Sequence, residues 1–306
     1  MIYTITLNPS LDYNISVDSF NTGQINIIDS LYLLPGGKGI NVAKVLNNLQ
    51  QPVEALGFLA GFTGREILSL LEKENLKFNF VELENGITRI NIKLKSSKET
   101  EINGQGPEVT KNDITKLMTN IRKIENGDFL VLSGSIPYSC HENIYETIIQ
   151  NTVDKDIKIV IDARKELLKD CLKYRPFLVK PNIDELGEMF NVKITSNDDL
   201  WKYSLKVKEL GARNVLVSLS KDGALLLGEN DEHYLATAPQ GKLINSVGAG
   251  DSMVAGFISG YIESNGDLAY TLKKAVATGS ASAFSKGLAT QAKVDQLIKK
   301  VTVSKK

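Results

Sequence analysis

Short apolar runs recur along the chain and end at turn residues, a pattern typical of buried β-strands. We expect such strands at residues 2–7, 53–59, 78–83, 128–132, 157–161, 177–179, 215–218, 224–227 and 233–236. Between them, apolar residues repeat every three or four positions, which predicts helices with one buried face. These helices are expected after Gly39 and after Asn182, and at residues 61–75, 114–124, 141–151, 200–210, 248–264, 267–286 and 291–300. Strands that alternate with helices predict an α/β fold with a mainly parallel sheet covered on both faces.

Two stretches follow a different pattern, in which polar and apolar residues alternate one by one. Residues 12–34 contain such alternations around Asn21-Thr-Gly23, and residues 88–103 alternate on both sides of Ser96-Ser-Lys98. An alternation of period two indicates strands with one exposed face. We therefore expect one small sheet, built from both stretches, within a single domain of residues 1–306.

Polar loops follow several of the predicted strands. In a parallel sheet the carboxyl ends of the strands share one edge, and ligands bind outside that edge. The sequence therefore predicts one cleft that collects the loops at residues 8–12, 133–135, 180–182, 218–220 and 245–251.

The stretch Asn245–Phe257 carries the clearest candidate chemistry. Gly248, Ala249 and Gly250 directly precede a helical pattern, so free backbone N–H groups and the helix dipole favour an anion there. Asp251 lies inside this anion site. Two interpretations stay open from these residues alone: Asp251 caps the helix, or it is a base that works beside a transferring phosphate.

Other candidates also have two interpretations each. Lys38 and Asn41 belong to a Gly-rich loop that either approaches a polar ligand or makes a plain tight turn. Asp12 either binds sugar hydroxyls or caps a turn. Arg89, which shares a strand face with Asn91, either holds a substrate phosphate together with Lys38 or is an exposed strand charge.

Asn182 and Glu185 are three residues apart at a helix start, so they meet on one side of its first turn. Such a pair contacts Mg²⁺ through water or caps the helix. The residues alone leave both roles open.

Composition narrows the classes of protein. Lys and Arg together balance Asp and Glu, 36 against 36, so no global field favours nucleic acid or a membrane. Cys140 and Cys171 have no metal-binding spacing, and no apolar run approaches the ~20 residues of a membrane span. The N-terminus has the pattern of a strand rather than a leader, so we expect a cytoplasmic protein. No P-loop is present, Met253 interrupts a dinucleotide fingerprint, and His141 and His233 offer no triad.

Four motifs, in their order and spacing, resemble those of the PfkB, or ribokinase-like, sugar kinase family. They are Asn8-Pro-Ser-Leu-Asp12, Gly36-Gly-Lys-Gly-Ile-Asn41, Lys180-Pro-Asn-x-x-Glu185 and Val247-Gly-Ala-Gly-Asp-Ser252. The resemblance spans the whole chain and implies a three-layer α/β/α fold, with residues 12–34 and 88–103 as a small β-sheet lid. In this family the lid also pairs subunits, so the resemblance implies a homodimer.

The resemblance further implies a role for each matched residue. Asp251 matches the catalytic base, and the anion hole for the transferring phosphoryl group matches Gly248, Ala249 and Gly250. Sugar-phosphate contacts are implied for Asp12, Gly37, Lys38, Asn41 and Arg89, and we expect beside them Asn91 and Ser135. The nucleotide side matches Lys180, Asn182, Ser218, Ser220, Gly223 and Ser246. Mg²⁺ is expected at Asn182 and Glu185, through water.

The activity implied in this way is ATP-dependent phosphorylation of a sugar phosphate. The expected acceptor is D-fructose 1-phosphate, which gives fructose 1,6-bisphosphate, and the alternatives are tagatose 6-phosphate and fructose 6-phosphate. Relatives that use fructose 6-phosphate carry basic residues where Gln24 and Asn26 stand here, which argues against that acceptor. A non-catalytic sugar-phosphate sensor on the same fold is the alternative of another class.

Overall fold

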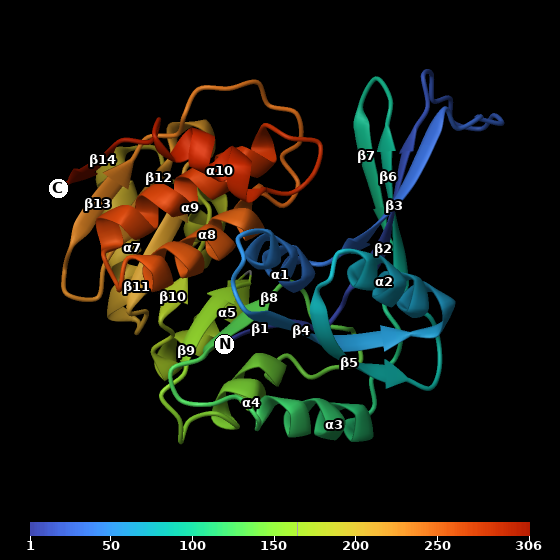
Figure 1. Ribbon diagram of the computed structural model, residues 1–306, viewed down its shortest axis with the longest axis horizontal. Helices are drawn as coiled ribbons and strands as arrows, with labels where there is room; N and C mark the ends of the chain where they lie inside the picture. The colour runs from blue at the N-terminus through green and yellow to red at the C-terminus, as the bar shows by residue number, and fades with distance from the viewer. Residues whose placement is uncertain (164) are drawn as a thin grey trace.

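A ten-stranded, mainly parallel sheet forms the centre of the molecule. The computed structural model describes residues 1–163 and 165–306. Seven neighbouring strands are parallel, in the order β11-β10-β9-β8-β1-β4-β5, and β12, β13 and β14 extend one edge antiparallel (Figure 1). The strands are β1 (Ile2–Thr6), β4 (Val53–Ala60), β5 (Lys77–Leu83), β8 (Phe129–Ser133), β9 (Lys158–Asp162), β10 (Leu178–Val179), β11 (Asn214–Ser218), β12 (Ala224–Leu227), β13 (His233–Ala236) and β14 (Val303–Lys305).

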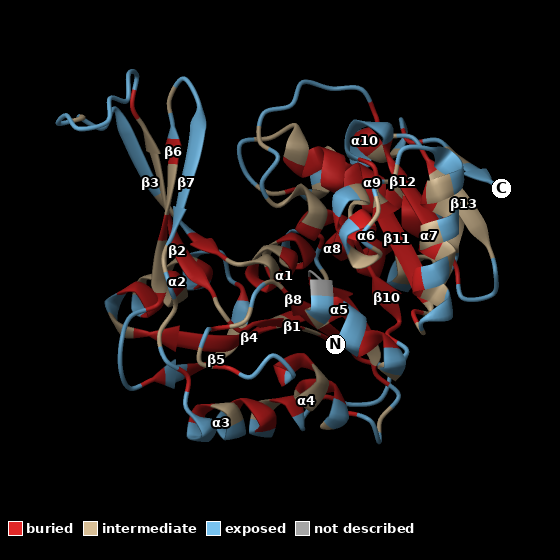
Figure 2. Cartoon of the chain, turned by 180° about the vertical axis from the view of Figure 1, so that it is seen from behind, coloured by how far each residue is buried: buried red, intermediate tan, exposed pale blue. Residues whose placement is uncertain are grey.

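Helices cover both faces of this sheet, because neighbouring strand residues point to opposite sides. Leu178 and Val179, for example, belong to two different apolar clusters. One cluster includes side chains of α1 (Lys38–Asn48), α2 (Gly61–Lys73), α8 (Ala249–Glu263), α9 (Leu268–Ala283) and α10 (Gln291–Ile298). The other includes side chains of α3 (Lys111–Ile121), α4 (Ile144–Gln150), α5 (Lys165–Cys171), α6 (Ile183–Met189) and α7 (Asn197–Glu209). Figure 2 shows the buried layer between them.

A second, four-stranded sheet projects from this body (Figure 1). Its order is β3-β2-β6-β7, from the strands β2 (Ser10–Ser16), β3 (Ser30–Gly36), β6 (Arg89–Lys95) and β7 (Glu99–Asn103). Asp12 lies opposite Asn91, and Asn91 lies opposite Asn103. Polar residues of β2, β6 and β7 therefore share one face of this sheet, to which β3 adds Tyr32 and Leu34, whereas the other face is mainly apolar.

The predicted α/β architecture and the small sheet are confirmed, with local differences. Asp12, expected in a loop, lies on β2. The pattern did not predict α5 or β14, because both are short and carry no clear apolar repeat. No helix in the described ranges is long and apolar enough to span a bilayer.

Candidate active site

One cleft of about 700 Å³ opens between the carboxyl edge of the large sheet and the polar face of the small sheet. Parallel strands deliver residues to it at their ends: Thr6, Ser133, Asp162 and Ser218 end β1, β8, β9 and β11. Most of the predicted site residues line this cleft, namely Asp12, Gly37, Lys38, Asn41, Arg89, Asn91, Ser135, Lys180, Asn182, Glu185, Ser218, Ser246, Gly248, Gly250 and Asp251. The predicted convergence of loops is thus present in the structure.

The start of α8 lines the cleft with Gly248, Gly250 and Asp251. Gly248 precedes the helix with φ +77°, a left-handed conformation that glycine adopts at little cost. Ala249 is the first helical residue, and Asp251 lies in the first turn. The Asp251 carboxylate does not cap its own helix start; its Oδ2 accepts a hydrogen bond from Nδ2 of Asn41 at 2.8 Å.

The pKa of Asp251 is raised from its ordinary value to about 6. Burial is the main cause, because it disfavours the charged form, and the nearby Asp162 carboxylate adds to it. Lys38, Asn41 and Lys180 act in the opposite direction. A buried carboxylate with such a pKa can accept a proton near neutral pH.

Asp162 is a central site residue that the sequence analysis missed. It is buried and forms ion pairs with Nζ of Lys38 at 3.0 Å and of Lys180 at 3.5 Å. Burial by itself raises the pKa of Asp162, but the two cations lower it below its usual value. The signal was present, because Asp162 directly follows a predicted buried strand at the same sheet edge.

The Asp12 carboxylate lies at the small-sheet end of the cleft. Its Oδ1 accepts hydrogen bonds from Oγ of Ser10 at 2.6 Å and Nδ2 of Asn91 at 3.2 Å. Its Oδ2 forms an ion pair at 2.8 Å with Lys93, a residue that the sequence analysis did not select. Gly36 lies against this group, and a Cβ there would meet Asp12 Oδ1 at 2.5 Å, so a larger residue would displace the carboxylate.

Arg89 and Lys38, which the sequence analysis grouped as phosphate ligands, have different partners. The Arg89 guanidinium donates to the backbone carbonyls of Asn8 and Pro9 at 3.1 to 3.3 Å. Burial lowers the pKa of Arg89, partly offset by Asp12. Lys38 instead contacts Asp162. Burial lowers the pKa of Lys38, but Asp162, together with Asp251 and Glu185, raises it above its usual value.

Asn182 and Glu185 form a capping box at the start of α6. The Asn182 side chain accepts from the Glu185 N–H at 2.8 Å, and the Glu185 carboxylate accepts from the Asn182 N–H at 3.0 Å. The capping alternative is therefore confirmed, and a metal role for the pair stays a prediction. Among the described residues, no group of three or more His, Cys, Asp or Glu is arranged to hold a metal ion.

Three predicted site residues do not line the cleft: Ala249, Ser220 and Gly223. Ser220 and Gly223 lie in the turn after β11, and both have positive φ, +55° and +105°. A Cβ on Gly223 would come 1.9 Å from the carbonyl oxygen of Ala236, so this position requires glycine. Their predicted role toward a nucleotide stays a prediction.

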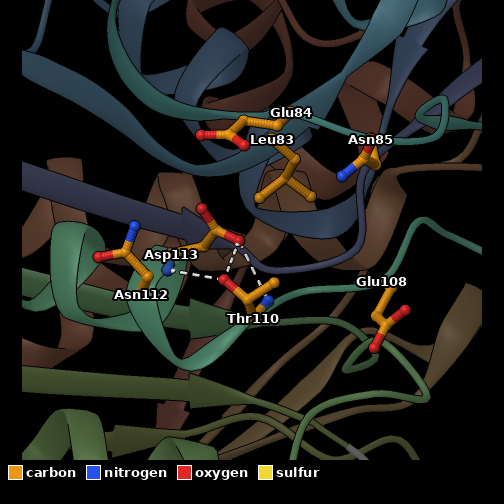
Figure 3. Close-up of a pocket in the computed structure, with 7 residues that line it drawn as sticks. All are labelled: Leu83, Glu84, Asn85, Glu108, Thr110, Asn112 and Asp113. Atoms are coloured by element: carbon orange, nitrogen blue, oxygen red, sulfur yellow. Dashed lines mark hydrogen bonds between the residues drawn. The ribbon is translucent and has the colours of Figure 1, made fainter.

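A second, smaller pocket of about 110 Å³ lies at the start of α3 (Figure 3). Thr110 and Asp113 form a capping box there, with the Thr110 Oγ donating to Asp113 at 2.6 Å. Glu84 and Glu108 make its surroundings acidic. Thr110 and Asp113 in this pocket cap a helix, and apart from this capping pair its described lining contains no nucleophile paired with a base. We therefore place the candidate active site in the larger cleft.

The site thus combines a covered parallel sheet, a small sheet with a polar face and a buried carboxylate in the first turn of a glycine-led helix. Residues 6–295 match the model of the pfkB family carbohydrate kinases. The chain is 45% identical to a 1-phosphofructokinase of Bacillus subtilis, with 100% of both chains covered. It is 36% identical to a D-tagatose-1-phosphate kinase of Bacillus licheniformis, with 99% of each covered.

Solved structures agree with this assignment. Phosphofructokinase-2 from Escherichia coli, in complex with substrates and products, superposes with a TM-score of 0.92 at 29% identity, covering 97% of this chain and 98% of that chain. This chain therefore belongs to the PfkB family of carbohydrate kinases.

Proposed function

We propose that the protein transfers the γ-phosphoryl group of ATP to D-fructose 1-phosphate, which gives fructose 1,6-bisphosphate and ADP. The observation that carries this proposal is the buried Asp251 carboxylate. It lies in the first turn of α8, directly after Gly248, Ala249 and Gly250, and accepts a hydrogen bond from Asn41 in the cleft. Similarity to the 1-phosphofructokinase of Bacillus subtilis supports this choice of acceptor.

In the proposed reaction Asp251 takes the proton of the attacking sugar hydroxyl. The hydroxyl oxygen bonds to the γ-phosphorus, the bond from this phosphorus to the bridging oxygen breaks, and ADP leaves. We assign the anion hole for the transferring group to Gly248, Ala249 and Gly250, where the helix dipole is positive. Gly248 and Gly250 line the cleft, whereas the Ala249 N–H donates to the Ser246 carbonyl at 3.3 Å. Phosphoryl transfer depends mainly on such positioning and charge stabilisation.

For the nucleotide, we assign Lys180, Asn182, Ser218, Ser220, Gly223 and Ser246.

The residues near Asp162 fit a Mg²⁺ ion as well. Asp162 Oδ2 is buried, belongs to a cleft-lining residue and has no hydrogen-bond partner in the described chain. Asn182 and Glu185 add oxygen atoms, the donors that Mg²⁺ prefers, and we expect them to act through water. The ion would neutralise charge on the phosphates when it is bound.

For the sugar phosphate, we assign Asp12, Gly37, Lys38, Asn41, Arg89, Asn91 and Ser135. Asp12 supplies the acceptor for sugar hydroxyls, since its carboxylate is fixed by Ser10 and Asn91. Asn41 reaches the same region from α1 and holds the base.

We also propose that two subunits pair through their small sheets. The face opposite Asp12 carries large apolar side chains that the single chain leaves open, with Leu31 and Ile102 52% and 59% exposed. Ile25 and Ile27 in the loop before β3 are 92% and 78% exposed. Exposed large apolar side chains on one small sheet and its loop are typical of an interface. Light scattering at micromolar concentration would give the mass of a dimer, whereas a monomer mass contradicts the pairing.

Tagatose 6-phosphate and fructose 6-phosphate remain the competing acceptors, and the similarity to a D-tagatose-1-phosphate kinase adds a third. Gln24 and Asn26, which replace basic residues of fructose-6-phosphate users, lie in the loop between β2 and β3 rather than in the cleft.

An ADP-release assay over a panel of ketose phosphates tests the assignment. We expect the highest kcat/KM with fructose 1-phosphate. Higher kcat/KM with another ketose phosphate would reassign the substrate, and binding without ADP release from any of them would favour the sensor.

A further inference from the structure

Lys93 occupies the middle of the polar face of the small sheet. It lies opposite Asn14 on β2 and opposite Glu101 on β7. Its ammonium group pairs with Asp12 at 2.8 Å rather than with Glu101, its cross-strand neighbour. The side chain is only 21% exposed and lines the cleft. The fold therefore turns this cation toward the sugar-binding carboxylate.

The other described cations of the cleft are engaged elsewhere. Lys38 and Lys180 share Asp162 at the large-sheet end. Arg89 donates through Nε and Nη2 to two backbone carbonyls, which holds its guanidinium against the loop after β1, and its Nη1 has no hydrogen-bond partner among the described residues. Lys93 has three N–H donors and uses one on Asp12, so two remain for an anion.

We propose that Lys93 binds the phosphate that the sugar already carries, and that it selects phosphorylated over unphosphorylated acceptors through Asp12. This inference rests on the proposed function and adds to it the residue that recognises the substrate phosphate. The reacting hydroxyl must face Asp251, and a ketose phosphate carries its phosphate at the other end of the sugar. The small-sheet end of the cleft, where Lys93 lies, is the end that remains.

The ion pair between Lys93 and Asp12 favours phosphorylated sugars and also disfavours unphosphorylated ones. A bound phosphate draws the ammonium toward itself and leaves Asp12 Oδ2 open to a sugar hydroxyl. A sugar without phosphate leaves Lys93 on Asp12, where it competes with the hydroxyl for that oxygen. Glu101 also faces this region, but it is exposed, so solvent and salt screen its repulsion of the phosphate.

Lys93→Met tests the proposal, with Lys95→Met as the matched control. Lys95 is two residues along the same strand on the same face, yet it is exposed and does not line the cleft. For Lys93→Met we expect kcat/KM for fructose 1-phosphate to fall about 10- to 100-fold, the usual effect of a hydrogen bond to a charged group. The kcat/KM for D-fructose should rise, because Lys93 no longer competes with the sugar hydroxyl for Asp12 Oδ2. The KM for ATP should stay within about twofold, as should every parameter of Lys95→Met.

Inorganic phosphate as an inhibitor gives a second measurement. It should compete with the sugar phosphate in the wild type, with a Ki raised in Lys93→Met and unchanged in Lys95→Met. Equal losses with fructose and fructose 1-phosphate would show that Lys93 only positions Asp12, and unchanged kinetics would show no role; either result overturns the proposal. A wild-type protein that phosphorylates no ketose phosphate would refute the proposed function instead.

Discussion

The two ends of the cleft hold carboxylates of nearly equal burial and different surroundings. Asp251 is 6% exposed and Asp12 is 7% exposed. Within the described chain, Asp251 has an amide partner, Asn41, and no ion pair, whereas Asp12 has Lys93 at 2.8 Å. The comparison teaches that two carboxylates of similar depth can be given different partners: burial raises the pKa of Asp251, whose partner is an amide, whereas Asp12 is held in an ion pair that orients it toward the cleft.

The largest effect is expected when the ionisable carboxylate at the Asp251 end of the cleft is replaced by an amide. Asp251→Asn keeps the shape and a hydrogen-bonding group, so we expect substrate binding within a few fold of the wild type. The kcat should fall by roughly 10²- to 10⁴-fold, the usual contribution of a positioned base. Steady-state kinetics with ATP and fructose 1-phosphate measures both quantities. Full activity in this variant would mean that Asp251 is only part of the helix start.

Asp162→Asn tests the charge balance beneath Asp251. The change leaves the Lys38 and Lys180 ammonium groups without their shared counter-charge in a largely buried site. Breaking a buried pair of this kind costs about 3–5 kcal/mol in the free energy of unfolding. Urea denaturation measures that loss. Asp113→Asn, in the capping box of α3 and also buried, is the control and should cost only about 1 kcal/mol. Equal losses in the two variants would contradict a special role for the Asp162 pairs.

The pH dependence of the wild-type rate sharpens the comparison further. Asp251 must be ionised to accept a proton, and its pKa is raised to about 6. The kcat should therefore be constant well above this pH and fall about tenfold per pH unit below it. An Asp with its ordinary pKa would keep the rate level to far lower pH. Profiles of kcat between pH 5 and 8.5, a range chosen to span ~1–2 units around the raised pKa, measure this acidic limb, the part of the profile in which kcat falls as the pH is lowered.

The substrate phosphate also titrates near pH 6, so a control is needed. Asp162→Asn supplies it, because Asp162 raises the pKa of Asp251 while Lys38 and Lys180 lower it. Without the Asp162 charge the limb should move to lower pH, although the substrate is unchanged. A limb that stays in place would assign it to the substrate.

Sequence reasoning found the Asp251 end of the cleft more completely than the Asp12 end. Gly248 and Asp251 are local, because a glycine before a helix and an acid in its first turn are visible in consecutive residues. Asp162 was equally visible at the end of its strand. Its function became clear only when Lys38 and Lys180, far away in sequence, were brought to it.

At the small-sheet end the needed information lies in strand register. Lys93 alternates with apolar neighbours as any exposed strand lysine does, and only the pairing of β2 with β6 brings it to Asp12. Arg89 is predicted to contact a phosphate, and in the structure the carbonyls of Asn8 and Pro9 compete for its Nε and Nη2 donors. Backbone carbonyls carry no sequence signal, so residue types alone could not reveal this competition.

The smallest expected effect tests whether Asp12 depends on its neighbours. Ser10 donates a buried hydrogen bond of 2.6 Å to Asp12 Oδ1, the oxygen that Asn91 also contacts. Ser10→Ala removes one neutral donor at a net cost of about 0.5–1.5 kcal/mol, so KM for the sugar phosphate should rise about 2- to 10-fold. The kcat should stay near the wild-type value, because Asp251 and Asn41 are untouched.

Ser16→Ala is the matched control, since Ser16 lies on the same strand and the same face but its hydroxyl bonds to that of Ser30 at the exposed end. Its kinetics should equal those of the wild type. A fall in kcat with unchanged KM in Ser10→Ala would contradict the division of labour between the two ends. It would mean that the Asp12 end acts in the transition state as well as in binding.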